Sequence, residues 1–508
     1  MNEAADTSQN LPRQSSRRSF LKQTALAAAA VSPLMAAADP APETGASGKP
    51  ANRPNVLLVI SDQYRWDFIC AYGHNPMDFT PNLDAMFRRG TAFENAFTNQ
   101  PLCSPARACL FTGQYATTTG VWKLDFGLQP GATTLATVLR AAGYSANYIG
   151  KWHLAPNSHS KPVTEGFVPL EYRGGFDGLW QASNVIERTT HPYQGTIWDA
   201  AGNPMTFDGI YRVDYLTDLA VKFLQQEHDK PFFLVLSQLE PHHDIDADGF
   251  VPPTGYDEKF RNPYVPPDLR PFPGDWPFQL ANYYGDCKRI DESMEKIFRT
   301  LHEQNLEDNT IVIFLSDHGC HFRTRNVEYK RSPHESSIHV PLLIQGPGFN
   351  NGGRISELVS LVDFAPTLLA ALGIDVPASM QGKSFFPLIS DPAARAAWRN
   401  EIFIQISESE TARALRTPEW TYVALAPGAK PGADASSPVY QDYQLYNNAA
   451  DPAQIINLAG RIDPPKLIHY AGNRSMRQIT DQLRERLLAR MEEAGETRPQ
   501  ITRWDYYP

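Results

Sequence analysis

Four short runs of consecutive apolar residues recur along the chain, and stretches with helical periodicity separate them. The runs are rich in β-branched and aromatic side chains, and they cover Asn55–Ile60, Tyr144–Ile149, Phe232–Leu236 and Ile311–Leu315. Strands that are apolar on both sides are typical of a parallel sheet that helices cover on both faces. The pattern therefore predicts an α/β fold, with helices that include Thr134–Ala142 and Tyr283–Gln304.

Charged or imidazole side chains follow each of these runs. In chain order they are Asp62, then Lys151 and His153, then His242 and His243, and finally Asp317 and His318. Loops are polar in general, which accounts for one or two such cases but not for all four. Ligands of open α/β sheets bind beyond the carboxyl ends of the strands. We therefore expect these side chains to form one active site at that edge of the sheet.

The pattern changes near Arg395, where shorter alternating runs replace the long apolar ones. These runs cover Glu401–Ile406 and Trp420–Ala424, and an amphipathic segment with apolar residues three or four apart follows from Met476 to Met491. We expect a small C-terminal α+β subdomain over residues 395–508, with an antiparallel sheet and a packing helix. The catalytic domain would then span residues 54–394.

The N-terminus carries the three parts of a bacterial export signal. Arg17-Arg18 lies within Ser16–Lys22, an apolar run follows from Thr24 to Leu34, and small residues end the segment at Ala38. We expect a twin-arginine export signal over residues 1–38, a flexible linker over 39–53, and a periplasmic or secreted protein. The twin-arginine machinery, a predicted partner, carries folded chains, so modification by cytosolic enzymes would come before export.

Composition narrows the choice of partners. No later run approaches 18 apolar residues, so we expect no membrane span in the mature protein. After residue 38 the chain has 42 Lys and Arg against 54 Asp and Glu, a net charge of −12, which argues against nucleic acid as a partner. A local cationic pocket could still take an anionic substrate. Five cysteines, an odd number without a C-x-x-C pair, argue against a disulfide framework.

Cys103 stands where a helix is predicted to begin. Ser104 can cap the helix, and Pro105 suits the first helical position. Cys103 would then face the positive end of the helix, with Arg107 one turn along, and such a site holds an anion and depresses the pKa of a thiol. On these grounds alone Cys103 could be a nucleophile, a metal ligand or a redox thiol.

The stretch Cys103-Ser104-Pro105-Ala106-Arg107, followed after four residues by Thr112-Gly113, resembles the signature of the type I sulfatases of the alkaline phosphatase superfamily. Other segments resemble the family in its own order: Asn55–Asp62, Gly150–His153, Ser316–Gly319, Lys330, His339–Leu342, Gly346–Gly348, Tyr443–Tyr446, Asp451-Pro452 and Asn457-Leu458. The resemblance covers roughly residues 54 to 460. It implies a large mixed, mostly parallel sheet sandwiched by helices, and the hydrolysis of sulfuric esters.

The resemblance also implies how Cys103 acts. In this family a dedicated maturation enzyme, a predicted partner of this chain, oxidises the cysteine to Cα-formylglycine. Hydration of that aldehyde gives two hydroxyls on one carbon; one attacks sulfur, and the second then expels sulfate from the sulfated enzyme. A serine at this position would lack the second hydroxyl.

Four cationic or basic residues take roles by the same resemblance. Arg107 and Lys151 would orient the diol and balance its charge. His153 would be the base or the hydrogen-bond partner of the second hydroxyl. Lys330 matches the family lysine that contacts sulfate.

Two adjacent histidines follow the third apolar run, and one of them is expected to be the general acid. His242 would protonate the leaving oxygen, which is the usual task of such a group. His243 is the rival for that role, and the position directly after Pro241 favours His242.

The expected metal site consists of Asp62, Gln63, Cys103, Asp317 and His318. Most relatives begin this site with two adjacent aspartates, so glutamine at position 63 removes one negative charge but keeps a carbonyl ligand. His318 stands where many members have asparagine, and imidazole also suits softer divalent ions. Calcium is the expected ion, with manganese or magnesium as alternatives.

Substrate choice is expected to come from two long segments without strong periodicity, residues 155–209 and 244–277. The predicted substrate-binding residues are Arg173, Arg188, His191, His243 and His334. With the aromatic residues of these segments, they predict a sulfated polysaccharide or oligosaccharide as substrate. The Asp-Gln and Asp-His pairs also resemble choline-sulfatase-like and phosphonate-monoester-hydrolase-like branches, so a hydrolase of phosphonate monoesters or phosphodiesters is the alternative. A non-catalytic protein that binds sulfated glycans is disfavoured, because every catalytic residue type is present.

Overall fold

The four predicted strands lie side by side and parallel at the centre of a large sheet. The computed structural model describes residues 53–158, 161–162, 165–459 and 476–503. The central strands, in spatial order, are β11 (Thr310–Ser316), β1 (Asn55–Ser61), β10 (Phe232–Gln238) and β3 (Ser145–Lys151). Ser61 pairs with Ser316 on one side and Gln238 on the other, so the carboxyl ends of these strands lie at one edge.

Further strands extend this sheet on both sides and make it mixed, as predicted. Beyond β11 lie β13 (Leu342–Gln345), β2 (Thr91–Phe97), β12 (His339–Val340) and β14 (Gly353–Ser360). Beyond β3 lie β6 (Trp180–Ser183), β8 (Gln194–Asp199), β7 (Thr190–His191) and β9 (Pro204–Asp208). β6 is parallel to β3, whereas β13 is antiparallel to β11.

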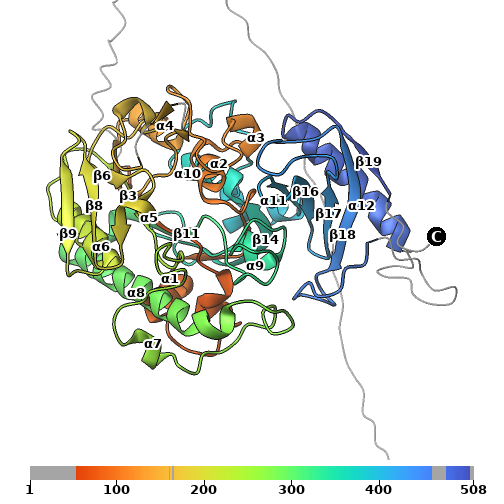
Figure 1. Ribbon diagram of the computed structural model, residues 1–508. Coiled ribbons are helices and arrows are strands. Elements are labelled where there is room, and N and C mark those ends of the chain that lie inside the picture. Colours follow the sequence, from red (N-terminus) through yellow and green to blue (C-terminus); the bar gives the residue numbers. More distant parts are fainter. Residues whose placement is uncertain (1–52, 159–160, 163–164, 460–475, 504–508) are drawn as a thin grey trace, which may run out of the picture. The chain divides into compact units, whose positions relative to one another are not determined.

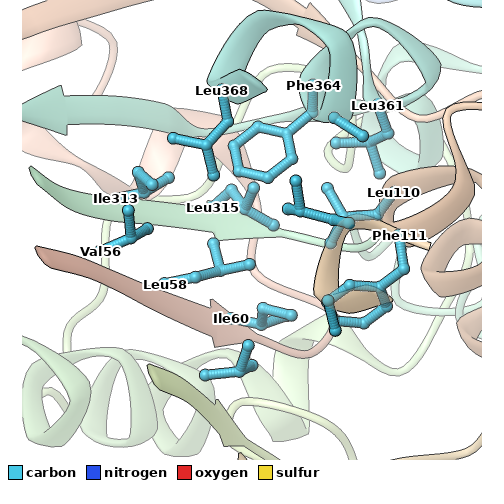
Figure 2. Close-up of a cluster of buried hydrophobic side chains, with 14 of the residues drawn as sticks. Val56, Leu58, Ile60, Leu110, Phe111, Ile313, Leu315, Leu361, Phe364 and Leu368 are labelled. Carbon is cyan, nitrogen blue, oxygen red and sulfur yellow. The ribbon is translucent and has the colours of Figure 1, made fainter. Parts of the chain in front are cut away.

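Helices cover both faces of the sheet, because the central strands are apolar on both sides. One face packs against α2 (Cys103–Thr112), α4 (Leu135–Ala141) and α10 (Leu361–Ala371). The other packs against α1 (Pro81–Arg89), α6 (Arg212–Leu224) and α8 (Trp276–Glu303). Alternate residues of β1 point into the two cores. Figure 2 shows Val56, Leu58 and Ile60 beside Leu110 of α2 and Phe364 of α10.

A second, smaller sheet forms the C-terminal part of the chain (Figure 1). Its strands are β15 (Ile402–Ile406), β16 (Ala412–Arg416), β17 (Trp420–Leu425), β18 (Val439–Asn447) and β19 (Gln500–Thr502). All neighbours are antiparallel except β18 and β19, and α12 (Met476–Glu493) packs its apolar residues against the sheet. The predicted sheet and helix are thus present, while a domain boundary at residue 394 stays a prediction.

The remaining elements are short. The helices are α3 (Ala116–Thr119), α5 (Ile186–Thr189), α7 (Tyr256–Lys259), α9 (Glu335–Ile338) and α11 (Pro392–Ala396). The 3-10 turns cover Trp66–Phe68, Cys70–Tyr72, Leu170–Tyr172, Glu307–Asn309 and Phe386–Ile389, and β4 (Asn157–Ser158) pairs with β5 (Lys161–Pro162).

The segment 155–209, expected to be irregular, instead contains β6 to β9 and α5. Short strands at a sheet edge leave little periodic signal in the sequence. The predicted export signal over residues 1–38, and the linker up to residue 52, lie outside the described residues. Within the described part of the chain, no helix has both the length and the apolar character needed to cross a bilayer.

Candidate active site

Cys103 is the first residue of α2, and its side chain is buried against charged groups from other elements. Its Sγ lies 3.1 Å from Nζ of Lys330, 3.3 Å from Nε2 of His318 and 3.7 Å from Oδ1 of Asp62. Burial alone would raise the pKa of the thiol, but Lys151, Lys330 and His318 hold it well below its ordinary value. The position therefore favours a negative charge on residue 103.

Asp62 and Asp317 lie at the ends of the neighbouring strands β1 and β11, and Arg107 of α2 bridges them. Its Nε donates to Asp317 at 3.0 Å and its NH2 group to Asp62 at 3.2 Å. Nζ of Lys151 lies 2.8 Å from Asp62. Burial would raise the pKa of Asp62, as would Cys103, but Lys151 and other cations lower it. Burial and Asp62 raise the pKa of Asp317, so the two acids together favour an added positive charge.

A divalent cation fits the donor atoms gathered here. One ligand atom from each of Asp62, Cys103, Asp317 and His318 lies within 4.8 Å of the others. Nδ1 of His318 donates to the carbonyl of Gly319 at 3.0 Å, which leaves the lone pair of Nε2 facing the two carboxylates. Sγ of Cys103 stands in for the oxygen that formylglycine would carry.

Gln63 adds a second indication that an ion belongs in this site. Its backbone has a φ of +68°, a strained value for a residue with a side chain. Its backbone N–H donates to Asp317, and its carbonyl accepts from Tyr283. The side-chain Oε1 is buried without a hydrogen-bond partner in the described structure. A buried oxygen in that state suits a hard cation.

His242 and Lys330 lie on the other side of Cys103. Nδ1 of His242 donates to the carbonyl of His243 at 2.7 Å, and Nε2 lies 2.9 Å from Nζ of Lys330. His243 is stacked between the rings of His242 and Tyr329, each 4.5 Å away between centroids. Burial, with His242 and Lys330, lowers the pKa of His243. Of the two histidines, His242 is the one that contacts Lys330, whose Nζ in turn hydrogen-bonds Cys103.

Glu187 also belongs to this cluster, although no sequence pattern pointed to it. Its Oε1 lies 2.9 Å from Nζ of Lys151 and 3.7 Å from Nδ1 of His153. Burial would raise the pKa of Glu187, but Lys151 and His153 lower it to about 2. The sequence offered little signal for it, because β6, which ends four residues before Glu187, has only the four residues Trp180–Ser183.

Four of the predicted substrate-binding residues contact protein groups outside the cluster around Cys103. Arg173 is buried and donates to the carbonyls of Val168 and Ala200, and its guanidinium lies over Trp180. Arg188 pairs with Glu165, and His191 pairs with Asp246; these two pairs are partly exposed.

His334 is buried, and its imidazole contacts Ser332 and the hydroxyl of Tyr446. Burial lowers the pKa of His334 well below its ordinary value. None of Arg173, Arg188, His191 and His334 contacts Cys103 in the described structure, so their role in substrate binding stays a prediction.

Known proteins resemble this chain over most of its length. The sequence model of the Sulfatase family matches residues 54–374. An ulvan-active sulfatase from Formosa agariphila is 28% identical over 480 residues, which cover 89% of this chain and 88% of that protein. Arylsulfatase K from Homo sapiens is 29% identical over 458 residues, which cover 80% of this chain and 79% of that protein.

Solved structures share the fold. A Bacteroides thetaiotaomicron protein described with the metabolism of multiple glycosaminoglycans has a TM-score of 0.72 at 22% identity, covering 87% of this chain and 97% of that one. A protein in complex with its substrate D-glucosamine-2-N,6-O-disulfate has a TM-score of 0.67 at 21% identity, covering 88% and 99%. The phosphonate monoester hydrolase of Agrobacterium radiobacter has a TM-score of 0.61 at 21% identity, covering 87% and 96%.

Proposed function

We propose a function from the premise that this chain belongs to the sulfatase family and is a sulfuric ester hydrolase. It removes sulfate from a polysaccharide or oligosaccharide outside the cytoplasm, with Cys103 converted to formylglycine. The observation that carries this proposal is the burial of Cys103 at the start of α2, in contact with Lys330, His318 and Asp62. That environment favours a nucleophile beside an anion site.

Formylglycine, once hydrated, would supply two hydroxyls on one carbon, one for attack on sulfur and one for release of sulfate. The chain's own cations would hold the sulfate against it. Arg107, Lys151 and Lys330 reach residue 103 or its carboxylate neighbours from three separate elements. Their buried position strengthens each interaction with an anion, because little water screens it.

A divalent cation, held by Asp62, Gln63, Asp317 and His318, would supply a Lewis acid next to residue 103. The chemistry of these donors suits calcium, and the imidazole also suits manganese. Arg107 keeps the two carboxylates oriented by bridging them. Removal of the ion with a chelator should abolish activity, and adding back calcium, manganese or magnesium separately should identify the ion.

His242 would donate the proton to the leaving alcohol. Its Nδ1–H is held by the carbonyl of His243, which fixes the ring. Nε2 here accepts from Lys330, and it would carry the transferable proton once that lysine turns to the bound sulfate. Nε2 lies 2.9 Å from Nζ of Lys330, so the acid and a sulfate-binding cation are adjacent. The leaving oxygen would then lie between them and residue 103.

A sulfated carbohydrate is the substrate class that the relatives support. The Formosa agariphila relative is named for activity on ulvan, and one structural neighbour was solved with a sulfated glucosamine. Residues above the strand ends would choose the sugar, among them the partly exposed Arg188 and His191. Both are held by carboxylates that a polyanionic glycan would have to displace.

Mass spectrometry tests the modification directly. The peptide that contains residue 103, from protein made together with a maturation enzyme, should be lighter than the cysteine form by about 18 mass units. Protein made without that enzyme should be folded and nearly inactive. Unmodified cysteine in a fully active sample would overturn the proposed use of formylglycine.

A substrate panel tests the assignment to carbohydrates. We expect kcat/KM on a sulfated oligosaccharide to exceed that on an aryl sulfate, and Arg188→Ala to reduce only the former. Arg173→Ala is the companion variant; because Arg173 is buried among packing contacts, its effect should appear mainly as lost stability. A preference for the aryl sulfate throughout would contradict the carbohydrate assignment.

A second candidate is the hydrolysis of phosphonate monoesters or phosphodiesters with the same modified residue. The observation that favours it is the expected metal set, in which Gln63 stands for an aspartate and His318 for an asparagine of many sulfatases, together with the fold shared with a phosphonate monoester hydrolase. Parallel assays of one matured preparation on sulfate, phosphonate and phosphodiester substrates separate the two. Higher kcat/KM on choline sulfate or a phosphonate than on every glycan would favour this second group.

A further inference from the structure

Glu187 is a buried carboxylate for which the mechanism above has no role. Its side chain is 7% exposed, and its Oε1 accepts from Nζ of Lys151 at 2.9 Å. The same oxygen is 3.7 Å from Nδ1 of His153, too far for a hydrogen bond. Oε2 of Glu187 and Nδ1 of His153 are both buried without a hydrogen-bond partner in the described structure. A carboxylate oxygen without a donor and an imidazole nitrogen without a partner therefore lie close together.

The sheet holds Glu187 in this place. β6 runs parallel to β3 with Lys151 opposite Ser183, and the pairing continues past the strand ends. The N–H groups of Trp152 and His153 donate to the carbonyls of Ser183 and Asn184 at 2.9 and 2.7 Å. α5 begins directly afterwards at Ile186 and carries Glu187 in its first turn.

The backbone of His153 is fixed as well. Its φ of +57° lies in the left-handed region, which costs free energy for a residue with a side chain and persists only where the surroundings enforce it. The side chain of Asn184 binds both the N–H and the carbonyl of Ala155, so the turn is held on its far side too. The backbone therefore fixes where the imidazole of His153 is attached, between Glu187 and residue 103.

We propose that Glu187 is a positioning residue that holds His153 with a proton on Nδ1, so that the lone pair of Nε2 faces residue 103. A small rotation of the carboxylate, about a torsion that is soft in glutamate, would bring one of its oxygens to Nδ1 and leave the other facing Lys151. A base whose second nitrogen is fixed by a carboxylate is the arrangement that prepares many nucleophiles. The proposal deepens the proposed function and rests on it, because it concerns the base that would serve residue 103.

Other contacts support this arrangement. His153 also helps to lower the pKa of the Cys103 thiol, so its imidazole lies close to the nucleophile position. Glu187 stays ionised at neutral pH, because Lys151 and His153 outweigh the effect of burial on its pKa. Lys151 keeps Asp62 as a second acceptor at 2.8 Å, so losing Glu187 does not strip it of its only counterion.

Steady-state kinetics of the matured protein give the first test. Glu187→Gln should lower kcat on an aryl sulfate about 10- to 100-fold and leave KM within about 3-fold, because on this proposal Glu187 acts through His153 and not on the substrate. Glu187→Asp should recover part of the loss. In a His153→Ala background, Glu187→Gln should have less than about a 2-fold further effect. Glu303→Gln, an exposed carboxylate at the far end of α8, is the matched control and should behave as wild type.

The protonation of His153 gives a readout that needs no turnover. We would record ¹⁵N chemical shifts of labelled histidines in Cys103→Ser protein, whose neutral hydroxyl can donate to Nε2 as a hydrated formylglycine would. The measurement is made at about pH 8, a pH above the ordinary pKa of histidine, and His153 is assigned from the signal lost on adding His153→Gln. With Glu187 intact, the ring should carry the proton on Nδ1. In Glu187→Gln the amide oxygen stays on Lys151, which only donates, so the amide NH2 faces Nδ1 and should move the proton to Nε2.

The outcomes separate the hypotheses. A ring with its lone pair on Nδ1 where Glu187 is intact, or the same ring state with and without Glu187→Gln, would overturn the proposal. So would kcat losses that multiply in the double variant, because Glu187 would then act through Lys151 or through the fold alone. A matured wild type that fails to cleave sulfate esters would count against the proposed function instead, and the ring state would still test Glu187.

Discussion

Two arginines without exposed surface, Arg413 in the smaller sheet and Arg107 beside Cys103, show two uses of a buried charge. Nε of Arg413 lies 2.9 Å from both carboxylate oxygens of Glu496. Its other donors meet the carbonyls of Ala412 and Ala435. One carboxylate therefore neutralises the charge, and the surrounding carbonyls complete its hydrogen bonds.

Arg107 instead joins a cluster that comes from several elements. It binds Asp62 and Asp317, and these acids also face Lys151, His318 and Cys103. Buried atoms nearby that have no hydrogen-bond partner in the described structure include Gln63 Oε1, His153 Nδ1 and Glu187 Oε2. Burial and ion pairing alone thus do not mark a functional site. A functional site is indicated when charged groups converge on one residue and leave buried polar atoms without hydrogen-bond partners among them.

The strongest test of this contrast is Cys103→Ala, which removes the residue on which the cluster converges. We expect kcat/KM on sulfate esters to fall by about 10⁴-fold or more, because binding groups remain but the nucleophile is lost. The melting temperature should change little. Cys109→Ala, a second buried thiol of α2, is the control and should keep its activity. Similar losses in both variants would mean that packing of α2, not chemistry, explains the effect.

Arg413→Met should separate stability from catalysis. Removing one partner of a buried ion pair leaves Glu496 unpaired, so the free energy of unfolding in urea should fall by about 3–5 kcal/mol. The kcat of the folded fraction should match wild type. Arg107→Met should lose comparable stability and also lose activity. Equal kcat losses in the two variants would break the comparison between the two arginines.

His242→Ala sharpens the comparison within the active site. We expect kcat/KM for alkyl sulfates to fall about 10²- to 10⁴-fold, because a poor leaving oxygen needs a proton. Aryl sulfates, whose leaving oxygen needs little protonation, should lose far less. His243→Ala serves as the control. If alkyl and aryl sulfates fall equally in His242→Ala, the acid is another group, and His243 or Lys330 is tested next.

The smallest effect is expected at Glu335 of α9, which pairs with Arg416 of β16 and with His339. Burial would raise the pKa of Glu335, but Arg416 and His339 lower it to about 2. A carboxyl whose pKa is lowered on folding stabilises above its unfolded pKa, and this stability is lost as pH falls from about 4.5 towards 2. Glu335→Gln should therefore cost about 2–3 kcal/mol at pH 7 and almost nothing near pH 2.

Urea unfolding at several pH values measures this difference, and kcat at pH 7 should be unchanged. A stability difference that stays constant down to pH 2 would mean that Glu335 acts through packing and not through its charge. A large fall in kcat would show that the ion pairs of the smaller sheet also serve the chemistry, against the contrast drawn above.

The central strands and most of the residues around Cys103 were predictable from the sequence. The apolar runs that became β1, β3, β10 and β11 are local patterns, and the chemical residues follow each run directly. Parallel strands place their carboxyl ends at one edge, so the gathering of Asp62, Lys151 and Asp317 followed from the strand pattern alone. Cys103 was recognisable because its motif is contiguous.

Only the tertiary structure decided which side chains meet across neighbouring strands. Glu187 reaches Lys151 because β6 pairs with β3 in one register, and a four-residue strand carries too little pattern to specify its neighbour. Arg173 is predicted to bind substrate, and the fold gives its guanidinium the carbonyls of Val168 and Ala200 and the ring of Trp180 as partners. The sequence shows that an arginine carries a charge, but the fold sets which group that charge contacts, because it brings distant segments together. The sequence thus determined which chemistry is present, and the pairing of strands decided which groups act on one another.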